Sequence, residues 1–128
     1  MTSEKIINHL ISFCFVFFLL FIFSVNKLSA EEVNWIEVVR TNTEIQFIDP
    51  NSITYNNKGF LSVITKYEEV NPEDQKVVNT NSYLMAVDCD SRLFSKLPVN
   101  ADIKQIKNWE EPINNKLIKK TILISCTY

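Results

Sequence analysis

The hydrophobic and polar positions divide the chain into two parts. The first part contains an uninterrupted apolar run, Leu10–Val25, of sixteen residues without a charge. In the second part, residues 31–128, apolar and polar residues alternate in short runs separated by turn signals, which is the pattern of β-strands. The pattern therefore predicts an N-terminal apolar segment followed by one small domain built around a sheet.

Six strands are predicted in this domain. They are expected at Trp35–Arg40, Glu44–Ile48, Ile53–Tyr55, Phe60–Tyr67, Ser82–Cys89 and Arg92–Leu97. A proline-containing turn at residues 49–52 follows the second strand, and an Asn/Gly turn at residues 56–59 joins the third and fourth strands into an antiparallel hairpin. The stretch Asn100–Asn108 fits either a turn of helix or an irregular connection.

The final segment, residues 114–126, fits two kinds of element. A helix capped by Asn114 would bury a stripe at helical spacing, made of Leu117, Ile118, Thr121, Ile122, Ser125 and Cys126. A strand is favoured instead by the β-branched run Thr121–Ile124. The pattern by itself leans to the helix and leaves the strand open.

The N-terminal segment has the layout of a secretory signal. A short start with Lys5 precedes the apolar run, and the small residue Ala30 marks a cleavage point. Sixteen helical residues span only about 24 Å of a hydrocarbon core roughly 30 Å thick, so a stable transmembrane helix is the weaker interpretation. We expect a signal peptide at residues 1–30 and a single domain at residues 31–128, located in the periplasm, on the cell surface or outside the cell. An uncleaved N-terminal anchor is the alternative.

Two cysteines remain after residue 30. Because an exported chain meets an oxidising compartment, Cys89 and Cys126 are expected to form a disulfide rather than two separate buried thiols. Closing a loop of about 38 residues restricts the unfolded chain by about 4 kcal/mol in the chain-entropy model.

Composition excludes several kinds of chemistry. The net charge is −2, and no cluster of basic residues indicates nucleic-acid binding. His9 is the only histidine and lies in the first 30 residues, so the domain has no histidine for nucleophilic catalysis or for a metal site. Gly59 is the only glycine, which rules out a phosphate-binding loop. We expect no cofactor and no metal.

Carboxylates are the remaining candidates for chemistry. Asp88 and Asp90 flank Cys89, and Glu110 and Glu111 follow Trp109. The acidic stretch Glu68–Asp74 contains an Asn-Pro pair and is interpreted as a solvated loop, while Asp88–Ser91 is interpreted as the end of a strand entering a turn. A carboxylate-based hydrolase, or an accessory subunit of an envelope enzyme complex, is therefore the alternative function.

Several short signals occur in one order along the domain. They are Trp35 with Val38, Phe47-Ile48-Asp49 with Ser52-Ile53, Asp88-Cys89 with Arg92, Trp109 with Pro112, and an apolar segment that ends at Cys126. In this order the chain resembles the surface-adhesin protein E-like family of bacterial envelope domains. The resemblance implies an α+β fold, with an antiparallel sheet of about five or six strands and a C-terminal helix tied to it by the disulfide. It also implies that Trp35 and Trp109 are core aromatics, and it implies no catalysis.

The expected function is that of a non-enzymatic, adhesin-like binding module of the cell envelope. Its partner would be an unidentified protein or surface component, and a membrane would be involved only through residues 1–30 if they are retained. Exposed aromatic side chains would serve as anchors. The candidates are Tyr55, Phe60, Tyr67, Phe94 and Tyr128.

The first prediction concerns processing of the N-terminal segment. Because the apolar run is short and is followed by Ala30, mass spectrometry of protein from the native host should find a mature N-terminus near Glu31. An intact Met1 in the membrane fraction would show instead that the segment is an anchor.

Overall fold

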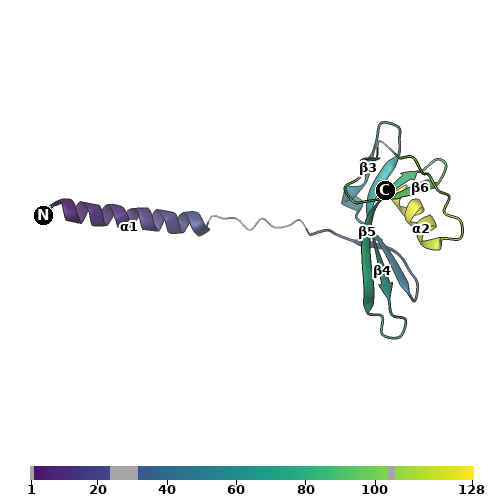
Figure 1. Cartoon of the computed structure of the whole chain (residues 1–128), viewed down its shortest axis with the longest axis horizontal. Coiled ribbons are helices and arrows are strands. Elements are labelled where there is room, and N and C mark those ends of the chain that lie inside the picture. The colour runs from purple at the N-terminus through teal and green to yellow at the C-terminus, as the bar shows by residue number, and fades with distance from the viewer. Residues whose placement is uncertain (1, 24–31, 104–105) are drawn as a thin grey trace. The chain divides into compact units, whose positions relative to one another are not determined.

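The structure is a computed structural model that describes residues 2–23, 32–103 and 106–128. The chain forms two compact units, Met1–Glu32 and Val33–Tyr128 (Figure 1). The expected cleavage point after Ala30 lies outside the described residues.

The described residues of the first unit form one helix, α1, which covers Thr2–Phe23. Its apolar side chains are exposed, and by length and composition it is able to cross a membrane, with a mean hydropathy of 2.1. A secretory signal near the N-terminus meets the same two criteria. The helix is therefore compatible with the predicted signal peptide.

The second unit is a six-stranded antiparallel sheet with a C-terminal helix (Figure 1). The strands are β1 (Ile36–Arg40), β2 (Glu44–Ile48), β3 (Thr54–Tyr55), β4 (Leu61–Val70), β5 (Val77–Asp88) and β6 (Leu93–Leu97), the 3₁₀ turn η1 covers Pro50–Ser52, and the helix is α2 (Lys116–Ser125). The strand order is β1-β2-β4-β5-β6, and β3 pairs with the start of β4. The predicted fold class is confirmed.

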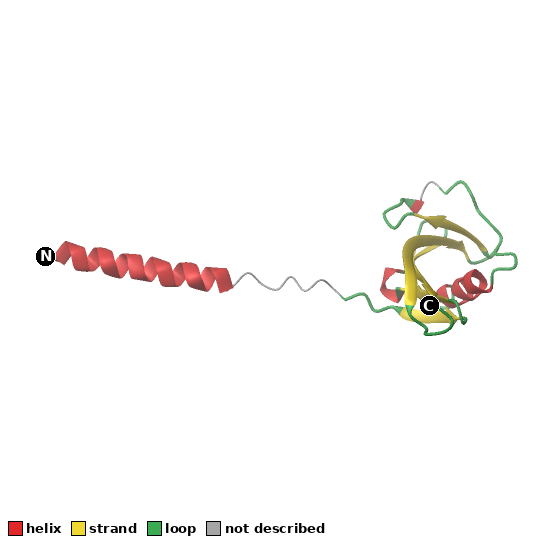
Figure 2. Ribbon diagram, turned by 60° about the horizontal axis from the view of Figure 1, so that its bottom comes forward, coloured by secondary structure: helices red, strands yellow, loops and turns green. Residues whose placement is uncertain are grey.

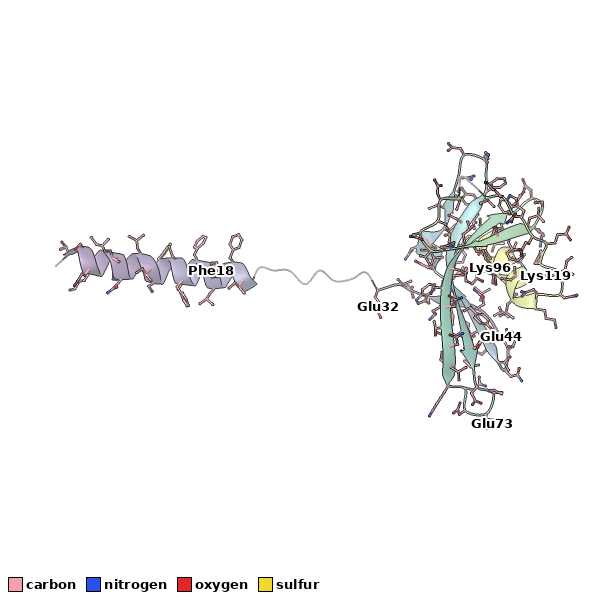
Figure 3. All side chains as sticks on the ribbon, in the orientation of Figure 1. Phe18, Glu32, Glu44, Glu73, Lys96 and Lys119 are labelled. Carbon is pink, nitrogen blue, oxygen red and sulfur yellow. A yellow bond between two sulfur atoms is a disulfide. The ribbon has the colours of Figure 1, made fainter. Side chains whose placement is uncertain are left out.

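The hairpin of β4 and β5 is longer than the sequence pattern predicted. Its register runs from Leu61 opposite Val87 to Val70 opposite Val77. The interpretation of Glu68 and Glu69 as loop residues is wrong, because both are paired with β2 on one side and with β5 on the other. The turn is confined to residues 71–76, and Figure 3 places Glu73 at its tip. β5 likewise begins at Val77, five residues before the predicted start.

The two predicted turns form as expected. The Asp49 side chain accepts a hydrogen bond from the Asn51 backbone at 3.0 Å and caps η1. The Asn56 side chain accepts bonds from the backbone N–H groups of Lys58 and Phe60, both at 2.9 Å, which closes the turn before β4. Gly59 has φ +81° in this turn, a conformation that residues with a Cβ adopt only at a cost.

The hydrophobic core lies between one face of the sheet and α2. The sheet supplies Ile48, Leu61, Val63, Tyr83, Met85, Val87 and Phe94, and the helix supplies Ile118 and Ile122. We call this side of the sheet the inner face. The alternation predicted for the fourth and fifth strands is therefore confirmed, and Figure 2 shows α2 lying against the bent sheet.

The C-terminal segment is a helix, and it begins one residue later than expected. Asn115, not Asn114, is the cap, because its side chain accepts a hydrogen bond from the Ile118 backbone at 3.1 Å. Asn114 has φ +55° and turns the chain into the cap. The predicted buried stripe is confirmed by Leu117, Ile118, Thr121, Ile122 and Ser125. The described residues of 100–108 contain no α-helix.

Neither tryptophan is a core residue, contrary to what the resemblance implied. Trp35 and Trp109 are both half-buried. Trp109 packs on Phe60 with the ring centroids 4.9 Å apart, and the Lys66 ammonium lies 5.2 Å from the centroid of the Trp35 ring. Large rings often remain partly exposed in a domain of this size, because one small core cannot enclose them.

The predicted disulfide between Cys89 and Cys126 is confirmed. Cys89 directly follows β5, Cys126 is the C-terminal cap residue of α2, and their Cα atoms are 5.9 Å apart. Both residues pack against the hydrophobic core. The bond therefore joins the end of the helix to the end of the longest strand.

The second prediction is that the disulfide maintains the docking of α2. Reduction, or the change Cys126→Ser, should lower the free energy of unfolding by about 2–5 kcal/mol, and each kcal/mol corresponds to about 4–8 °C in the midpoint of thermal unfolding. Limited proteolysis should then cut residues 116–128 first.

The double variant Cys89→Ser/Cys126→Ser serves as the control for reduction, because it removes the bond without a reducing agent. Its unfolding midpoint should match that of the reduced protein. Two alkylatable thiols at these positions in the exported protein would contradict the assignment.

Candidate binding site

The carboxylates around Cys89 serve a turn. The Asp88 side chain accepts hydrogen bonds from the backbone N–H groups of Asp90 at 3.1 Å and Ser91 at 3.4 Å. Hydrogen bonding from Ser91 holds the pKa of Asp88 below its usual range. Asp88 is therefore an ionised turn residue, as the sequence interpretation expected.

Glu110 and Glu111, the second carboxylate pair, lie in different surroundings. The backbone of Glu110 pairs with that of Phe94 through two hydrogen bonds of 2.8 and 3.0 Å, which adds a bridge beside β6. Glu111 lines a groove beside α2. Among residues 2–23, 32–103 and 106–128, no three carboxylate, cysteine or histidine side chains are grouped so that they could hold a metal ion.

The candidate aromatic side chains are dispersed. Phe94 is 5% exposed and belongs to the core, and Phe60 packs on Trp109. Tyr55 and Tyr128 are exposed, while Tyr67 lines a groove on the inner face. The structure therefore does not gather the five rings into one surface.

A groove of about 790 Å³ runs beside the solvent-facing side of α2. We call it the helix groove, and it is lined by Val39, Ser91, Arg92, Glu111, Pro112, Ile113, Asn114, Lys116, Lys119, Lys120, Ile122 and Leu123. Four of these residues are basic and one is acidic. Figure 3 shows Lys119 projecting from the helix.

The charge of the helix groove is opposite in sign to that of the whole chain, which has a net charge of −2. Helical spacing brings Lys116, Lys119 and Lys120 together, because residues three and four apart share one side of a helix. The turn after β5 brings Arg92 to the same groove, and its φ of +57° places it in the left-handed region. The sequence pattern assigned no binding role to these three lysines or to Arg92, which lies 24 residues before Lys116 in the chain.

A second groove, of about 590 Å³, lies where the start of α2 meets the inner face of the sheet. We call it the tyrosine groove, and it is lined by Glu44, Gln46, Tyr67, Asn81, Ser82, Tyr83, Lys96, Leu97, Pro98, Asn115, Leu117 and Ile118. Four strands and the helix contribute to it, because β2, β4 and β5 are neighbours in the sheet and β6 follows β5.

Hydrogen bonds arrange the polar groups of the tyrosine groove. The Tyr67 hydroxyl donates to Glu44 Oε1 at 2.7 Å, and burial together with this bond raises the pKa of Tyr67. The Tyr83 hydroxyl donates to Gln46 Oε1 at 3.4 Å, and burial raises the pKa of Tyr83 as well. Both tyrosines therefore stay neutral at physiological pH. The Lys96 ammonium lies 4.9 Å from the centroid of the Tyr83 ring.

Gln46 is the exceptional residue of this groove. Its side chain is 1% exposed, and its amide nitrogen Nε2 has no hydrogen-bond partner within the described part of the chain. A buried amide N–H group without a partner lowers stability by about 1–3 kcal/mol, so natural structures contain few of them. The strand pattern does not single out Gln46, because a polar residue in an alternating strand is expected to face solvent.

Comparison with known proteins identifies a family. A family model described as the Surface adhesin-E family matches residues 36–128, which is the whole sheet together with α2. No curated protein and no solved structure matches the chain. The match covers most of the chain and spans both cysteines of the disulfide. This chain therefore belongs to the surface adhesin-E family.

Proposed function

We propose that this protein is an exported, non-enzymatic binding module of the cell envelope that contacts an acidic region of a partner protein through the helix groove. The observation that carries the proposal is the grouping of four basic side chains around a groove in a chain of negative net charge. Membership of the surface adhesin-E family supports a binding role at a surface, and the apolar helix α1 supports export.

The apolar residues of the helix groove favour a protein as the partner. Ile113 is 68% exposed and Leu123 is 45% exposed, and both lie among the lysines. Protein interfaces combine an apolar centre with a polar rim, and complementary charges increase the rate and the specificity of association. Tyr55 and Tyr128, which are also exposed, are proposed as further contacts outside the groove.

The placement of the carboxylates supports binding over the alternative of a carboxylate-based hydrolase. A hydrolase of that kind needs two carboxylates facing each other across a substrate site. Asp88 is occupied with the backbone of its own turn, and Glu68 is paired with Lys66 at 2.9 Å. The proposed function therefore assigns the carboxylates to folding and the basic groove to recognition.

The third prediction tests the basic groove by charge reversal. The triple variant Lys116→Glu/Lys119→Glu/Lys120→Glu should lose retention of the full chain on immobilised poly-L-glutamate. Retention of the unmodified protein should fall as salt is raised from about 0.1 M to about 1 M, because the screening length shortens from about 10 Å to about 3 Å. Acidic residues near the start of a helix interact favourably with its dipole, so the variant should remain folded.

The matched control is Lys58→Glu/Lys76→Glu/Lys107→Glu, which changes the net charge equally at exposed lysines that do not line the helix groove. The control should keep most of its retention. Equal losses in both triple variants would show that only the net charge matters, and the proposal would then fail.

A further inference from the structure

In the described part of the chain, the tyrosine groove has a buried donor without an acceptor and the helix groove has none. Gln46 lines the groove, and its Nε2 atom has no partner among the described residues, while its Oε1 atom accepts from the Tyr83 hydroxyl. Rotating the amide by half a turn would exchange the two atoms and leave the other end unpaired. The nitrogen itself is enclosed in this structure, so a ligand in the groove would gain this hydrogen bond once the Gln46 side chain turns toward it.

The charges of the groove balance. Among the described residues that line it, Glu44 is the only acidic one and Lys96 is the only basic one. The Glu44 carboxylate uses Oε1 to accept from Tyr67, and its other oxygen and remaining lone pairs can accept further bonds. The groove as a whole therefore favours a neutral ligand over an anion or a cation.

The ligand has to supply acceptors and donors at short spacing. An acceptor is needed at the Gln46 amide nitrogen and a donor at the Glu44 carboxylate, and these two residues lie on the same face of β2, two positions apart. A hydroxyl group both donates and accepts, so neighbouring hydroxyls on one ring satisfy both side chains. Leu97, Pro98 and Leu117 add apolar surface for the C–H groups of such a ring.

We propose that the tyrosine groove binds a neutral saccharide, with Gln46 donating to one ring hydroxyl and Glu44 accepting from a neighbouring one. The volume of about 590 Å³ lies within the roughly 300–1,000 Å³ of small-molecule sites. Asn81, Ser82 and Asn115 stand at the same groove and provide further donors and acceptors. The inference uses no residue of the helix groove and does not depend on the acidic partner proposed above.

The fourth prediction is tested by titrating the isotope-labelled full chain and recording backbone amide spectra. The probes are glucose, galactose, mannose, N-acetylglucosamine and disaccharides built from them, and glycine and glutamate serve as charged comparators. The detergent that holds α1 in solution must have no sugar headgroup, because such a headgroup would compete for the site. At least one saccharide should cause saturable shifts at Gln46, Tyr83 and Lys96, and the charged comparators should not.

Two variants separate binding from folding. Gln46→Met keeps the length of the side chain and removes the amide, so it should weaken saccharide binding by about tenfold, the factor that corresponds to one lost hydrogen bond. Because Gln46→Met also removes the oxygen that accepts from the Tyr83 hydroxyl, its stability is measured in the Tyr83→Phe background, where it should leave the midpoint of thermal unfolding unchanged or raise it. Glu44→Gln should also weaken binding, since it replaces a charged acceptor in the groove.

The matched control is Glu69→Gln. Glu69 lies directly opposite Glu44 in the sheet and accepts from the same Tyr67 hydroxyl at 3.5 Å, but it does not line the groove. Its replacement should leave saccharide binding unchanged, as should the helix-groove triple variant.

Three results would overturn the inference. They are the absence of saturable shifts with every saccharide, unchanged binding in Gln46→Met, and a lower unfolding midpoint on adding Gln46→Met to Tyr83→Phe, which would show that the amide nitrogen supports the fold. Saturable shifts with glycine or glutamate alone would reassign the groove to a charged ligand. A failure of this kind leaves the poly-L-glutamate experiment unaffected, so the two proposals fail separately.

Discussion

The docking of α2 onto the inner face of the sheet is the contact on which both grooves depend. α2 has only ten residues, and an isolated helix of that length is marginal in water. Ile118 and Ile122 enter the core, and full burial of each such side chain contributes about 1.5–3 kcal/mol. Because the apolar stripe faces the sheet, the lysines necessarily face outward and form one wall of the helix groove. The first turn of the same helix forms one wall of the tyrosine groove.

Both ends of α2 are fixed, so the groove walls have defined positions. Asn115 caps the start of the helix through the Ile118 backbone, and Cys126 joins its end to Cys89. Upstream of the cap, Glu110 forms a backbone bridge with Phe94, which holds the connection from β6 against the edge of the sheet. A binding site gains affinity when its groups need no ordering at the moment of binding. Under the two proposals, the disulfide contributes to recognition as well as to stability.

Alternation and cysteine counting predicted the sheet, its turns and the disulfide, because these features depend on local spacing and on the redox compartment. The β4–β5 hairpin was predicted too short. Residues 77–82 are exposed on both faces of the sheet, so the sequence shows no alternation of apolar and polar residues there. Only the backbone pairing with β4 identifies this part of the strand. The helix cap was displaced by one residue, since Asn114 and Asn115 have the same capping chemistry and the positive φ of Asn114 decides between them.

The two grooves could not be predicted from sequence patterns, because each is lined by residues from separate elements. Arg92 reaches the helix groove through a turn after β5, and the tyrosine groove joins β2, β4, β5, β6 and α2 through the sheet topology. Tyr67 was selected as a candidate binding aromatic, and its hydroxyl donates to Glu44 within a groove. Gln46 was not selected, because a strand pattern carries no information on which polar residue faces the core.

The buried polar residues of the domain show why Gln46 requires an explanation beyond folding. Thr65 donates to the Tyr83 carbonyl at 3.1 Å and Thr121 donates to the Leu117 carbonyl at 2.7 Å, so both hydroxyls are satisfied by the backbone. Ser125 also lacks a partner among the described residues, but a serine in a helix can turn its hydroxyl toward the carbonyl four residues earlier. The Gln46 amide differs, because its oxygen accepts from the Tyr83 hydroxyl while its nitrogen has no partner among the described residues. The total stability of such a domain is expected to be about 5–15 kcal/mol. A buried donor without a partner lowers this free energy of unfolding by about 1–3 kcal/mol, which is a substantial part of it. An apolar side chain at this position would avoid that loss but would remove the acceptor of the Tyr83 hydroxyl, whereas the ligand proposed for the groove would give the amide nitrogen the acceptor that it lacks.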